Sequence, residues 1–183
     1  MGIQCRGNAK RDWLSVFGTS AGWFDGTGDY VSSANSTDWN LGSTNTIDCW
    51  VKFYAASTMG IINARNSANG WYWNYNGTAV TVHDGTTSGS YTWTPIVNTW
   101  YHLATCNTGG ALKIYVNGIG NTVTGTFSDF NNDSQALAIG SQQNDGTSGF
   151  NGQIDEVRVS KGSARYSANF VPPTVEYSTG AVS

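Results

Sequence analysis

The chain is built from short stretches in which apolar and β-prone residues alternate with polar ones. The most regular is residues 46–53, where Ile47, Cys49, Val51 and Phe53 occupy every second position. Because successive side chains of a strand point to opposite faces of a sheet, this alternation predicts a half-buried β-strand. Similar short stretches bounded by turn residues occur at 59–62, 70–75, 78–83, 91–93, 100–106, 111–116 and 135–139.

Turn residues between these stretches predict antiparallel hairpins. Asn76-Gly77 lies between two of the stretches and Asn117-Gly118 follows another, and Asn-Gly is the strongest short hairpin signal. Strands that recur at such short intervals are typical of a sandwich or barrel. We predict an all-β fold of two antiparallel sheets, with one helical turn at residues 163–169. The predicted core includes Ile47, Val51, Ile61, Leu103, Ile114 and Ile139.

One late stretch, residues 150–162, organises the prediction. Ile154, Val157 and Val159 stand among polar neighbours, and glycines bound the stretch. The earlier stretch at residues 23–31 matches it as a partner. We expect these two segments, far apart in sequence, to meet and close the sandwich.

The length of the chain favours a single domain with terminal additions. A chain of 183 residues can bury a core of ordinary size. We place the β-domain at residues 23–162. Residues 1–22 are either a strand docked on this domain or an arm that contacts a partner, and residues 163–183 are a C-terminal extension that packs on the domain.

Composition and charge exclude several classes of function. Charged residues make up 11% of the chain and aromatic residues 13%, and the net charge is -3. The basic residues cluster only at Arg6, Lys10 and Arg11. A weakly acidic chain with this charge distribution does not suggest a nucleic-acid partner. No apolar run is long enough for a transmembrane helix, and residues 1–22 lack the apolar centre of a signal peptide. We therefore predict no membrane insertion and synthesis without a signal peptide.

The three cysteines do not form a metal-binding pattern. Cys5, Cys49 and Cys106 are far apart, with no Cys-x-x-Cys pair and no companion histidine. Cys49 and Cys106 lie in strand-like stretches, where a free cysteine behaves as a small apolar residue. A disulfide bond between these two is the alternative.

Several of these stretches, taken together and in order, resemble a known family. They are residues 24–31 (FDGTGDYV), 47–51 (IDCWV), 98–104 (NTWYHLA), 112–118 (LKIYVNG), 137–140 (LAIG) and 150–158 (FNGQIDEVR). The set is similar to laminin-G-like domains of the concanavalin A-like lectin/glucanase superfamily. This resemblance implies a jelly-roll β-sandwich of two antiparallel sheets, one of them concave. The family is functionally broad, so the fold alone does not supply an activity.

The end of the chain carries a narrower resemblance. Residues 159–174 (VSKGSARYSANFVPPT) are similar to the closing segment of such domains in phage and prophage virion proteins. That resemblance implies a place on the virion surface, with other virion proteins as partners. It also implies many copies per particle or a homo-oligomer.

The carboxylates do not match the glycoside hydrolases of the superfamily. Retaining enzymes hold two carboxyl groups about 5 Å apart and inverting enzymes roughly 6.5–9.5 Å apart. Asp155 and Glu156 are sequence neighbours, so on a strand they point to opposite faces. The superfamily's Glu-x-Asp-x-x-Glu pattern is absent, and neither His83 nor His102 accompanies a nucleophile motif. We predict a non-catalytic protein.

The resemblance also implies a calcium site. Many superfamily members hold Ca²⁺ between an early and a late strand, and the matching positions here are Asp25 and Asp155. Carboxylate oxygens are ligands that calcium prefers. The alternative is that Asp25 caps a turn and Asp155 accepts backbone hydrogen bonds.

The aromatic stretch at residues 71–75 is the predicted ligand site. Trp71, Trp73 and Tyr75 share one face, and Asn74 lies on the other. A sugar stacks on an exposed ring while amides bond its hydroxyls. The alternative is that one of the two faces belongs to the core. Trp50 is a weaker candidate of the same kind.

These observations predict a non-catalytic virion surface protein that binds host cell-surface glycan or decorates the particle. A purely structural cement or knob protein without a ligand is the first alternative. A polysaccharide-acting enzyme of the same superfamily is the second.

Overall fold

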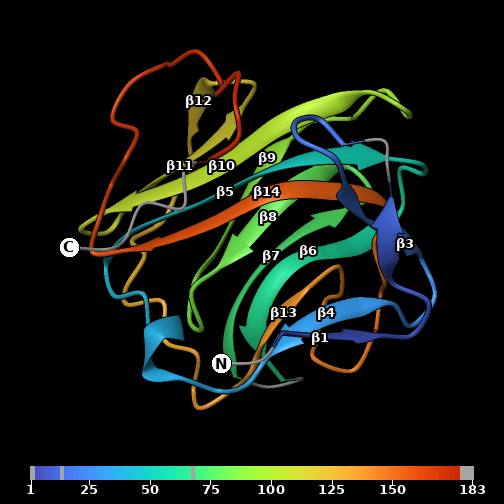
Figure 1. The fold of residues 1–183 in the computed structure, drawn as a ribbon. Coiled ribbons are helices and arrows are strands. Elements are labelled where there is room, and N and C mark those ends of the chain that lie inside the picture. Colours follow the sequence, from blue (N-terminus) through green and yellow to red (C-terminus); the bar gives the residue numbers. More distant parts are fainter. Residues whose placement is uncertain (1–2, 13–14, 67–68, 178–183) are drawn as a thin grey trace.

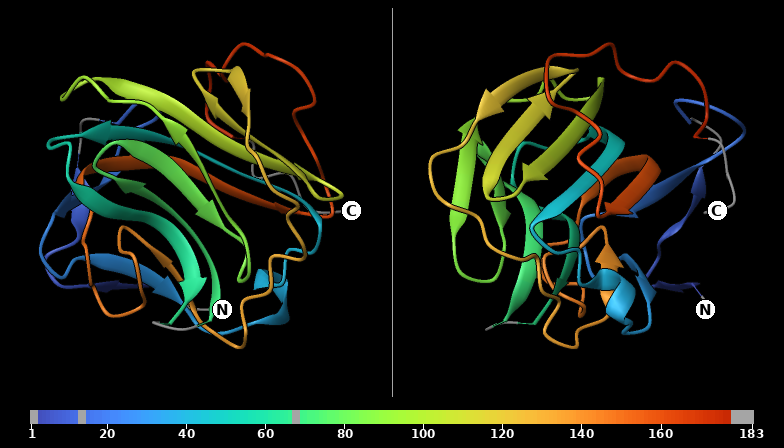
Figure 2. Two further views of the ribbon diagram at one scale, coloured as in Figure 1. Left: turned by 180° about the vertical axis from the view of Figure 1, so that it is seen from behind. Right: turned by 90° about the vertical axis from the view of Figure 1, so that its left-hand side faces the viewer.

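The computed structural model describes residues 3–12, 15–66 and 69–177. Two seven-stranded sheets pack face to face (Figures 1 and 2). Sheet A contains, in spatial order, β1 (Ile3–Arg6), β4 (Tyr30–Ser33), β13 (Leu137–Ile139), β6 (Thr58–Arg65), β7 (Gly70–Asn76), β8 (Ala79–His83) and β9 (Ser88–Thr92). Sheet B contains β12 (Ile119–Thr122), β11 (Ala111–Val116), β10 (Trp100–Thr108), β5 (Thr44–Phe53), β14 (Asn151–Lys161), β3 (Ala21–Asp25) and β2 (Lys10–Asp12).

The predicted fold class is confirmed, since all strand pairs in both sheets are antiparallel. The hairpins at Asn76-Gly77 and Asn117-Gly118 join β7 to β8 and β11 to β12. Asn117 and Gly118 have φ angles of 48° and 77°, the left-handed pair that a type I′ turn requires. The alternating stretch at 46–53 lies within β5.

The two segments expected to close the sandwich do meet. β3 pairs with β14 from Asn151 opposite Asp25 to Ile154 opposite Gly22. On its other side β14 runs along β5, with a register shift between Asp155 and Arg158. β14 is therefore an internal strand of sheet B, where it joins β3 and β2 to the rest of the sheet.

The core is made where the inner faces of the two sheets meet. Ile47, Val51, Ile61, Leu103 and Ile114 are at most 1% exposed, as predicted. The remaining predicted core residue, Ile139 on β13, is half-buried and packs against this core.

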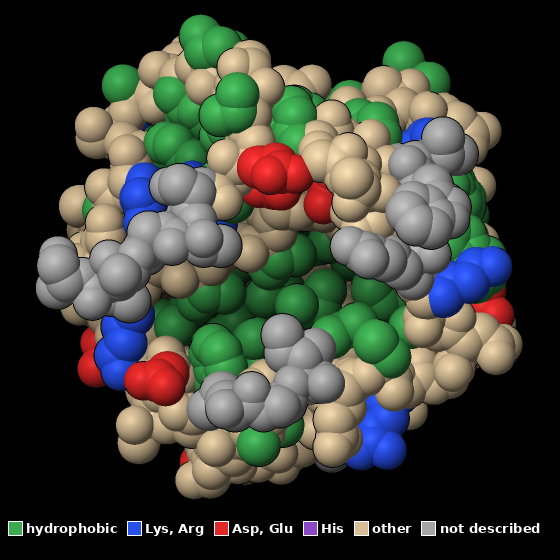
Figure 3. Space-filling view, in the orientation of Figure 1, with side chains coloured by type: hydrophobic (Ala, Val, Ile, Leu, Met, Phe, Trp, Pro, Cys, Tyr) green, Lys and Arg blue, Asp and Glu red, His purple; other side chains and the backbone are tan. Residues whose placement is uncertain are grey.

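The core reaches the surface on one face of the molecule. Figure 3 shows apolar side chains gathered in a hollow between the two sheets, in the orientation of Figure 1. β14 pairs with β3 only as far as Ile154. Beyond that point Val157 and Val159 of β14 are half-buried, and so are Val31 and Ile139 of sheet A.

The terminal segments add to both sheets. β1 and β2 lie within residues 1–22, and β1 pairs with β4 while β2 pairs with β3. Residues 163–177 cross the outer face of sheet B, where Tyr166 and Phe170 pack on a small buried cluster. The members of that cluster are Ala104, Cys106 and Tyr115.

The helical turn predicted at 163–169 is wrong. This segment is irregular, and the helical element of the described chain is instead a 3-10 turn at Thr37–Trp39. The reason lies in its backbone bonds. The N–H of Arg165 donates to the Thr46 hydroxyl at 2.9 Å, and the Thr46 hydroxyl donates to the carbonyl of Ser163 at 2.9 Å. The N–H of Arg165 and the carbonyl of Ser163 thus bond to a side chain of β5 and do not form the hydrogen bonds of a helical turn.

A buried carboxylate holds the C-terminal extension to sheet B. Arg158 donates to Asp48 through Nε at 3.0 Å and through Nη2 at 2.6 Å. The hydroxyls of Tyr166 and Tyr177 donate to the same carboxylate at 2.8 and 2.9 Å. His102 lies beneath, fully buried, with Nε2 3.0 Å from the Tyr177 hydroxyl. The histidine therefore has a packing role here.

All three cysteines are free. Cys49 is buried in the main core and Cys106 lies in the cluster under the C-terminal extension, so sheet B separates their side chains. Among the described residues, no helix is long and apolar enough to span a membrane.

Candidate functional site

The predicted aromatic ligand residues of β7 face the core. Trp71, Trp73 and Tyr75 are at most 1% exposed. The Trp71 indole donates to the carbonyl of Trp39 at 2.8 Å, and the Tyr75 ring packs 5.4 Å from that of Phe53. Rings buried to this extent cannot stack on a sugar. The structure therefore favours the alternative in which this face of β7 is core.

The opposite face of β7 points outward from sheet A. Asn74 is 4% exposed there, whereas Tyr72 is only half-buried. The Tyr72 ring stacks on His83 of β8, with centroids 5.0 Å apart and an interplanar angle of 26°. The Arg65 guanidinium lies 4.3 Å from the Tyr72 centroid. Tyr72 thus lies between Arg65 of β6 and His83 of β8, and the partly exposed Tyr72–His83 pair is the surface that β7 offers to a ligand.

The imidazole of this pair is held neutral at physiological pH. Burial lowers the pKa of His83, and the Arg65 charge acts in the same direction, against the opposite effect of the Asp84 carboxylate. His83 Nδ1 lies 2.9 Å from the Ser88 hydroxyl. The pair therefore has the character of an aromatic platform rather than of a cation.

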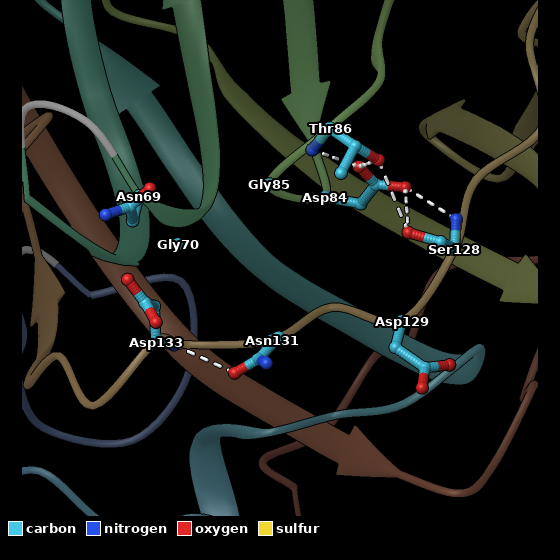
Figure 4. Close-up of a pocket in the computed structure, with 9 residues that line it drawn as sticks. All are labelled: Asn69, Gly70, Asp84, Gly85, Thr86, Ser128, Asp129, Asn131 and Asp133. Atoms are coloured by element: carbon cyan, nitrogen blue, oxygen red, sulfur yellow. Dashed lines mark hydrogen bonds between the residues drawn. The ribbon is translucent and has the colours of Figure 1, made fainter.

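A cleft of about 590 Å³ opens beside this platform. Three connections form it: the β6–β7 loop, the β8–β9 loop, and the segment between β12 and β13. Its lining residues are Asn69, Gly70, Asp84, Gly85, Thr86, Ser128, Asp129, Asn131 and Asp133 (Figure 4). We call it the polar cleft.

Asp84 fixes the shape of the polar cleft. Its Oδ1 accepts from the N–H groups of Thr86 and Thr87 at 2.8 and 2.7 Å, and its Oδ2 accepts from the N–H of Ser128 at 2.6 Å. Burial alone would raise the pKa of Asp84, but these N–H donors outweigh it and the pKa is lowered. This carboxylate is used internally, to tie the β8–β9 loop to the segment at 128–133.

Other polar groups of the cleft are free to bind a ligand. Asp129 and Asp133 are exposed, and nothing within the described chain bonds their carboxylates. Asn69 is also exposed, and Asn131 uses its carbonyl to accept from the N–H of Asp133 at 2.9 Å, leaving its amino group. Figure 4 shows Asp84, Thr86 and Ser128 joined at one side of the cleft, with Asn69 and Asp133 at the other.

The polar cleft lies beside the Tyr72–His83 pair, since residues of its lining adjoin both members along the chain. Tyr72 pairs with His83 across β7 and β8. Gly70 of the cleft lies two residues before Tyr72 on β7, and Gly85 lies two residues after His83, past the end of β8. Residues two apart on a strand share a face. A ligand in the cleft can therefore extend over the Tyr72–His83 pair. Carboxylates and amides beside an aromatic surface are the groups that bind hydroxyls and sugar faces.

The predicted calcium ligands do not come together. Asp25 lies opposite Asn151, and Asp155 is four residues further along β14, which is roughly 13 Å on a strand. Asp25 accepts from the N–H of Thr27 at 2.7 Å, and Asp155 from the N–H of Val16 at 2.9 Å. This is the alternative of a turn cap and a backbone acceptor. No group of three or more His, Cys, Asp or Glu in the described part of the chain could hold a metal ion.

Three carboxyl groups with lowered pKa values are poorly suited to general-acid catalysis. Asp25, Asp48 and Asp84 all have lowered pKa values. A general acid at neutral pH needs a raised one.

Sequence reasoning missed the polar cleft because three separate loops build it. Asp84-Gly85 was visible only as the end of a strand. The Asn- and Asp-rich run at 128–134 was the one available signal, since such residues stabilise turns through side-chain-to-backbone bonds.

Comparison with known proteins supports the architecture. The family model Laminin_G_3, described as the concanavalin A-like lectin/glucanases superfamily, matches residues 25–165. No curated protein sequence matches the chain.

Solved structures similar to this fold share little sequence with it. One is domain 4 of AbnA, an extracellular arabinanase from Geobacillus stearothermophilus, in complex with arabinotriose. It has a TM-score of 0.68 and 19% identity, with 89% of this chain and 82% of that one covered. A candidate carbohydrate binding protein from Bacteroides ovatus has a TM-score of 0.64 and 20% identity, with 80% of this chain and 44% of that one covered.

The binding domain of botulinum neurotoxin serotype D gives a TM-score of 0.61 and 14% identity, with 87% of this chain and 42% of that one covered. The chain thus spans less than half of the last two proteins. Likeness at these identities establishes the fold alone.

Proposed function

The chain belongs to the concanavalin A-like lectin/glucanases superfamily, and we propose that it is a non-catalytic carbohydrate-binding domain whose site is the polar cleft with the adjoining Tyr72–His83 pair. The observation that carries this proposal is the set of unbonded carboxylates and amides beside a partly exposed aromatic surface. Such a site can bind several hydroxyls of a saccharide and stack one of its rings.

The similar structures support a saccharide as the ligand class. The arabinanase domain was solved in complex with arabinotriose. A further similar structure is that of botulinum neurotoxin type C, whose cell entry depends on interaction with two ganglioside molecules. Both ligands carry many hydroxyls, which suits a cleft lined by Asn and Asp.

The test is glycan binding by three single variants, Tyr72→Ala, Asn69→Ala and Asp133→Ala. A glycan array that includes arabino-oligosaccharides and ganglioside headgroups identifies the ligand, and calorimetry then measures its affinity. We expect each variant to weaken binding by about tenfold, the loss of one or two hydrogen bonds or a stacking contact. Asn121→Ala on β12, an exposed edge of the other sheet, is the matched control and should bind as the parent protein does.

Two results would contradict the proposal. Unchanged affinity in all three variants, with native circular dichroism spectra, would remove the cleft as the site. An array on which the parent protein binds no saccharide would leave a structural role, such as a cement protein, as the better account.

We further propose that the domain acts on the surface of a phage particle. The support is the resemblance of residues 159–174 to the closing segment of phage and prophage virion versions of the fold. Many copies on a particle would strengthen individually weak sugar contacts through avidity. Antibodies against the purified domain should label intact particles from the producing strain in electron microscopy. If the antibodies label the particles only after disruption, the protein lies inside the particle instead.

A further inference from the structure

Five side chains from neighbouring strands form one row across the outer face of sheet B. The register places Lys10 of β2 opposite Trp23 of β3, and Trp23 opposite Gln153 of β14. Gln153 in turn lies opposite Lys52 of β5, and Lys52 opposite Trp100 of β10. Figure 1 shows β14, β5 and β10 side by side, and the strand order of sheet B adds β3 and β2 beyond β14. We call this set the Trp23–Trp100 row.

The row points outward and has the length of an oligosaccharide. Ile154, the neighbour of Gln153, packs into the core, so Gln153 and its partners lie on the other face. Adjacent strands are about 4.8 Å apart, so Trp23 and Trp100 are separated by roughly 14 Å. Trp23, Lys52 and Trp100 are half-buried and Lys10 is exposed.

Both lysines of the row lie close to indole rings. Lys10 Nζ is 4.4 Å from the centroid of Trp23, and Lys52 Nζ is 5.8 Å from that of Trp100. At these distances the ammonium groups are attracted to the ring faces. The row therefore presents two cations beside its two indole rings.

The centre of the row contains an amide without a partner. Gln153 is 0% exposed, and neither its carbonyl oxygen nor its amino group has a hydrogen bond within the described chain. The indole N–H of Trp50, next to Lys52 on the same face, is also unbonded. Buried polar groups are normally bonded, and leaving them unbonded is unfavourable. A ligand that reaches between Trp23 and the flexible Lys52 side chain would supply the missing bonds.

We propose that the Trp23–Trp100 row is a second binding site, separate from the polar cleft, and that its ligand is an acidic oligosaccharide. The ammonium groups of Lys10 and Lys52 bind the carboxylates of the sugar. The rings of Trp23 and Trp100 stack on the faces of sugar units at the two ends. Gln153 accepts from and donates to hydroxyls between them.

The charge of the row favours an acidic ligand over a neutral one. Its charged side chains are both cations, in a chain of net charge -3. The acids of the adjacent rows, Asp25 and Asp155, are already occupied by backbone N–H groups. The polar cleft has the opposite character, since its lining includes three aspartates and no Lys or Arg. The two sites therefore select ligands of different charge.

The test uses hexagalacturonate and its fully methyl-esterified form, which has the same sugar units without the charge. We expect calorimetry to show that the intact protein binds the acid form. Its affinity for the acid form should fall at high salt, and its affinity for the ester should be at least about fivefold lower. Lys52→Gln and Trp23→Ala should each lower the affinity for the acid form by about fivefold or more. Lys161→Gln, which removes the same charge at the far end of β14, should not.

Gln153→Leu separates a binding role from a structural one. Replacing a buried, unbonded amide by an apolar side chain of similar size should raise the melting temperature. If the amide also bonds the ligand, the same variant binds hexagalacturonate more weakly even though it is more stable. Three outcomes would overturn the proposal: no binding of hexagalacturonate at low salt, equal binding of acid and ester, or full affinity in Lys52→Gln and Gln153→Leu.

Discussion

At the scale of single residues, the least replaceable polar group is Asp48. Its side chain is fully buried, yet it is satisfied by the Arg158 guanidinium and by two tyrosine hydroxyls. A buried charge is tolerated only when it is paired and hydrogen-bonded. Burial of the Tyr166 and Tyr177 hydroxyls raises their pKa values, and the negative charge of Asp48 acts in the same direction. Both hydroxyls therefore stay protonated and keep donating.

Asp48→Asn should therefore destabilise the protein. The variant removes the charge that compensates Arg158 and leaves the donors of three side chains competing for one amide carbonyl. We expect the free energy of unfolding to fall by about 3 kcal/mol, the lower end of the range for buried ion pairs, because the Arg158 side chain is 25% exposed. Urea denaturation measures this loss. Asp145→Asn at an exposed turn is the control, and an equal effect of the two variants would contradict the assignment.

The same carboxylate predicts how stability depends on pH. Burial alone would raise the pKa of Asp48, but the bonds from His102, Arg158 and Tyr166 outweigh it and the pKa is lowered. A carboxyl with a lowered folded-state pKa contributes stability that is present above its unfolded pKa and lost as pH falls through the folded one. Stability should thus fall below about pH 4. The fall should be shallower in Asp48→Asn, and identical acid profiles would show that Asp48 does not contribute.

Sequence reasoning placed Asp48 on the face opposite the core but did not find its partners. Alternation within residues 46–53 is a local signal, and it identified the core face of β5 correctly. Arg158 is 110 positions away and Tyr177 is 129 positions away. Their approach depends on the register of β14 and on the path of the C-terminal extension, neither of which a local pattern encodes.

At the scale of elements, the C-terminal extension acts as a cover over part of sheet B. The rings of Tyr166 and Phe170 stack 3.7 Å apart and lie over Cys106 and Tyr115. The Tyr115 hydroxyl donates to the carbonyl of Tyr166 at 3.0 Å. The cover is thus held by stacking and by hydrogen bonds as well as by Asp48.

Thiol labelling should report whether this cover is in place. Cys5 is exposed and should react quickly with a thiol reagent in the native protein, whereas Cys49 and Cys106 are buried and should not. In a Cys5→Ser background, the double variant Tyr166→Ala, Phe170→Ala should expose Cys106 to labelling. Cys49 should stay protected, because burial in the core raises its thiolate pKa. Labelling of Cys49 and Cys106 at the same rate would indicate global unfolding instead.

The β7 strand shows what an element's pattern can and cannot predict. Its alternation correctly separated Trp71, Trp73 and Tyr75 from Tyr72 and Asn74. It could not say which face is core, because both carry aromatic residues and aromatic rings serve packing and binding equally well. Position within the sandwich decided the matter, and the outward face is the one that adjoins the polar cleft.

At the scale of the whole molecule, one core serves both sheets. Phe53 of sheet B packs against Tyr75 of sheet A at 5.4 Å and against Phe150 at 5.2 Å. The buried cluster continues through strands of both sheets. Neither sheet could keep its inner face from water without the other.

Unfolding should accordingly be a single cooperative transition. Far-ultraviolet circular dichroism follows the strands, and tryptophan fluorescence includes the signal of Trp71 and Trp73 in the core. The two should give coincident urea curves. A fluorescence change well before the loss of strand signal would show that the two sheets separate first, and would contradict a shared core.

The sequence predicts the architecture at this scale better than it predicts the sites. Turn residues and alternation specified most strands, and the pairing of residues 23–31 with 150–162 followed from their matched patterns. The polar cleft and the Trp23–Trp100 row arise from register and loop placement. Lys10 and Trp100 join the same row only because three strands from distant parts of the chain lie between Lys10 and Trp100.

The internal place of β14 in sheet B also determines what happens when synthesis stops early. β5 and β3 leave the ribosome long before β14, the neighbour that they share. Until residues 151–161 emerge, both strands have an unpaired edge, and such edges recruit strands from other chains. A premature stop codon near the 3′ end of the message would thus yield an aggregating product rather than a shortened working domain.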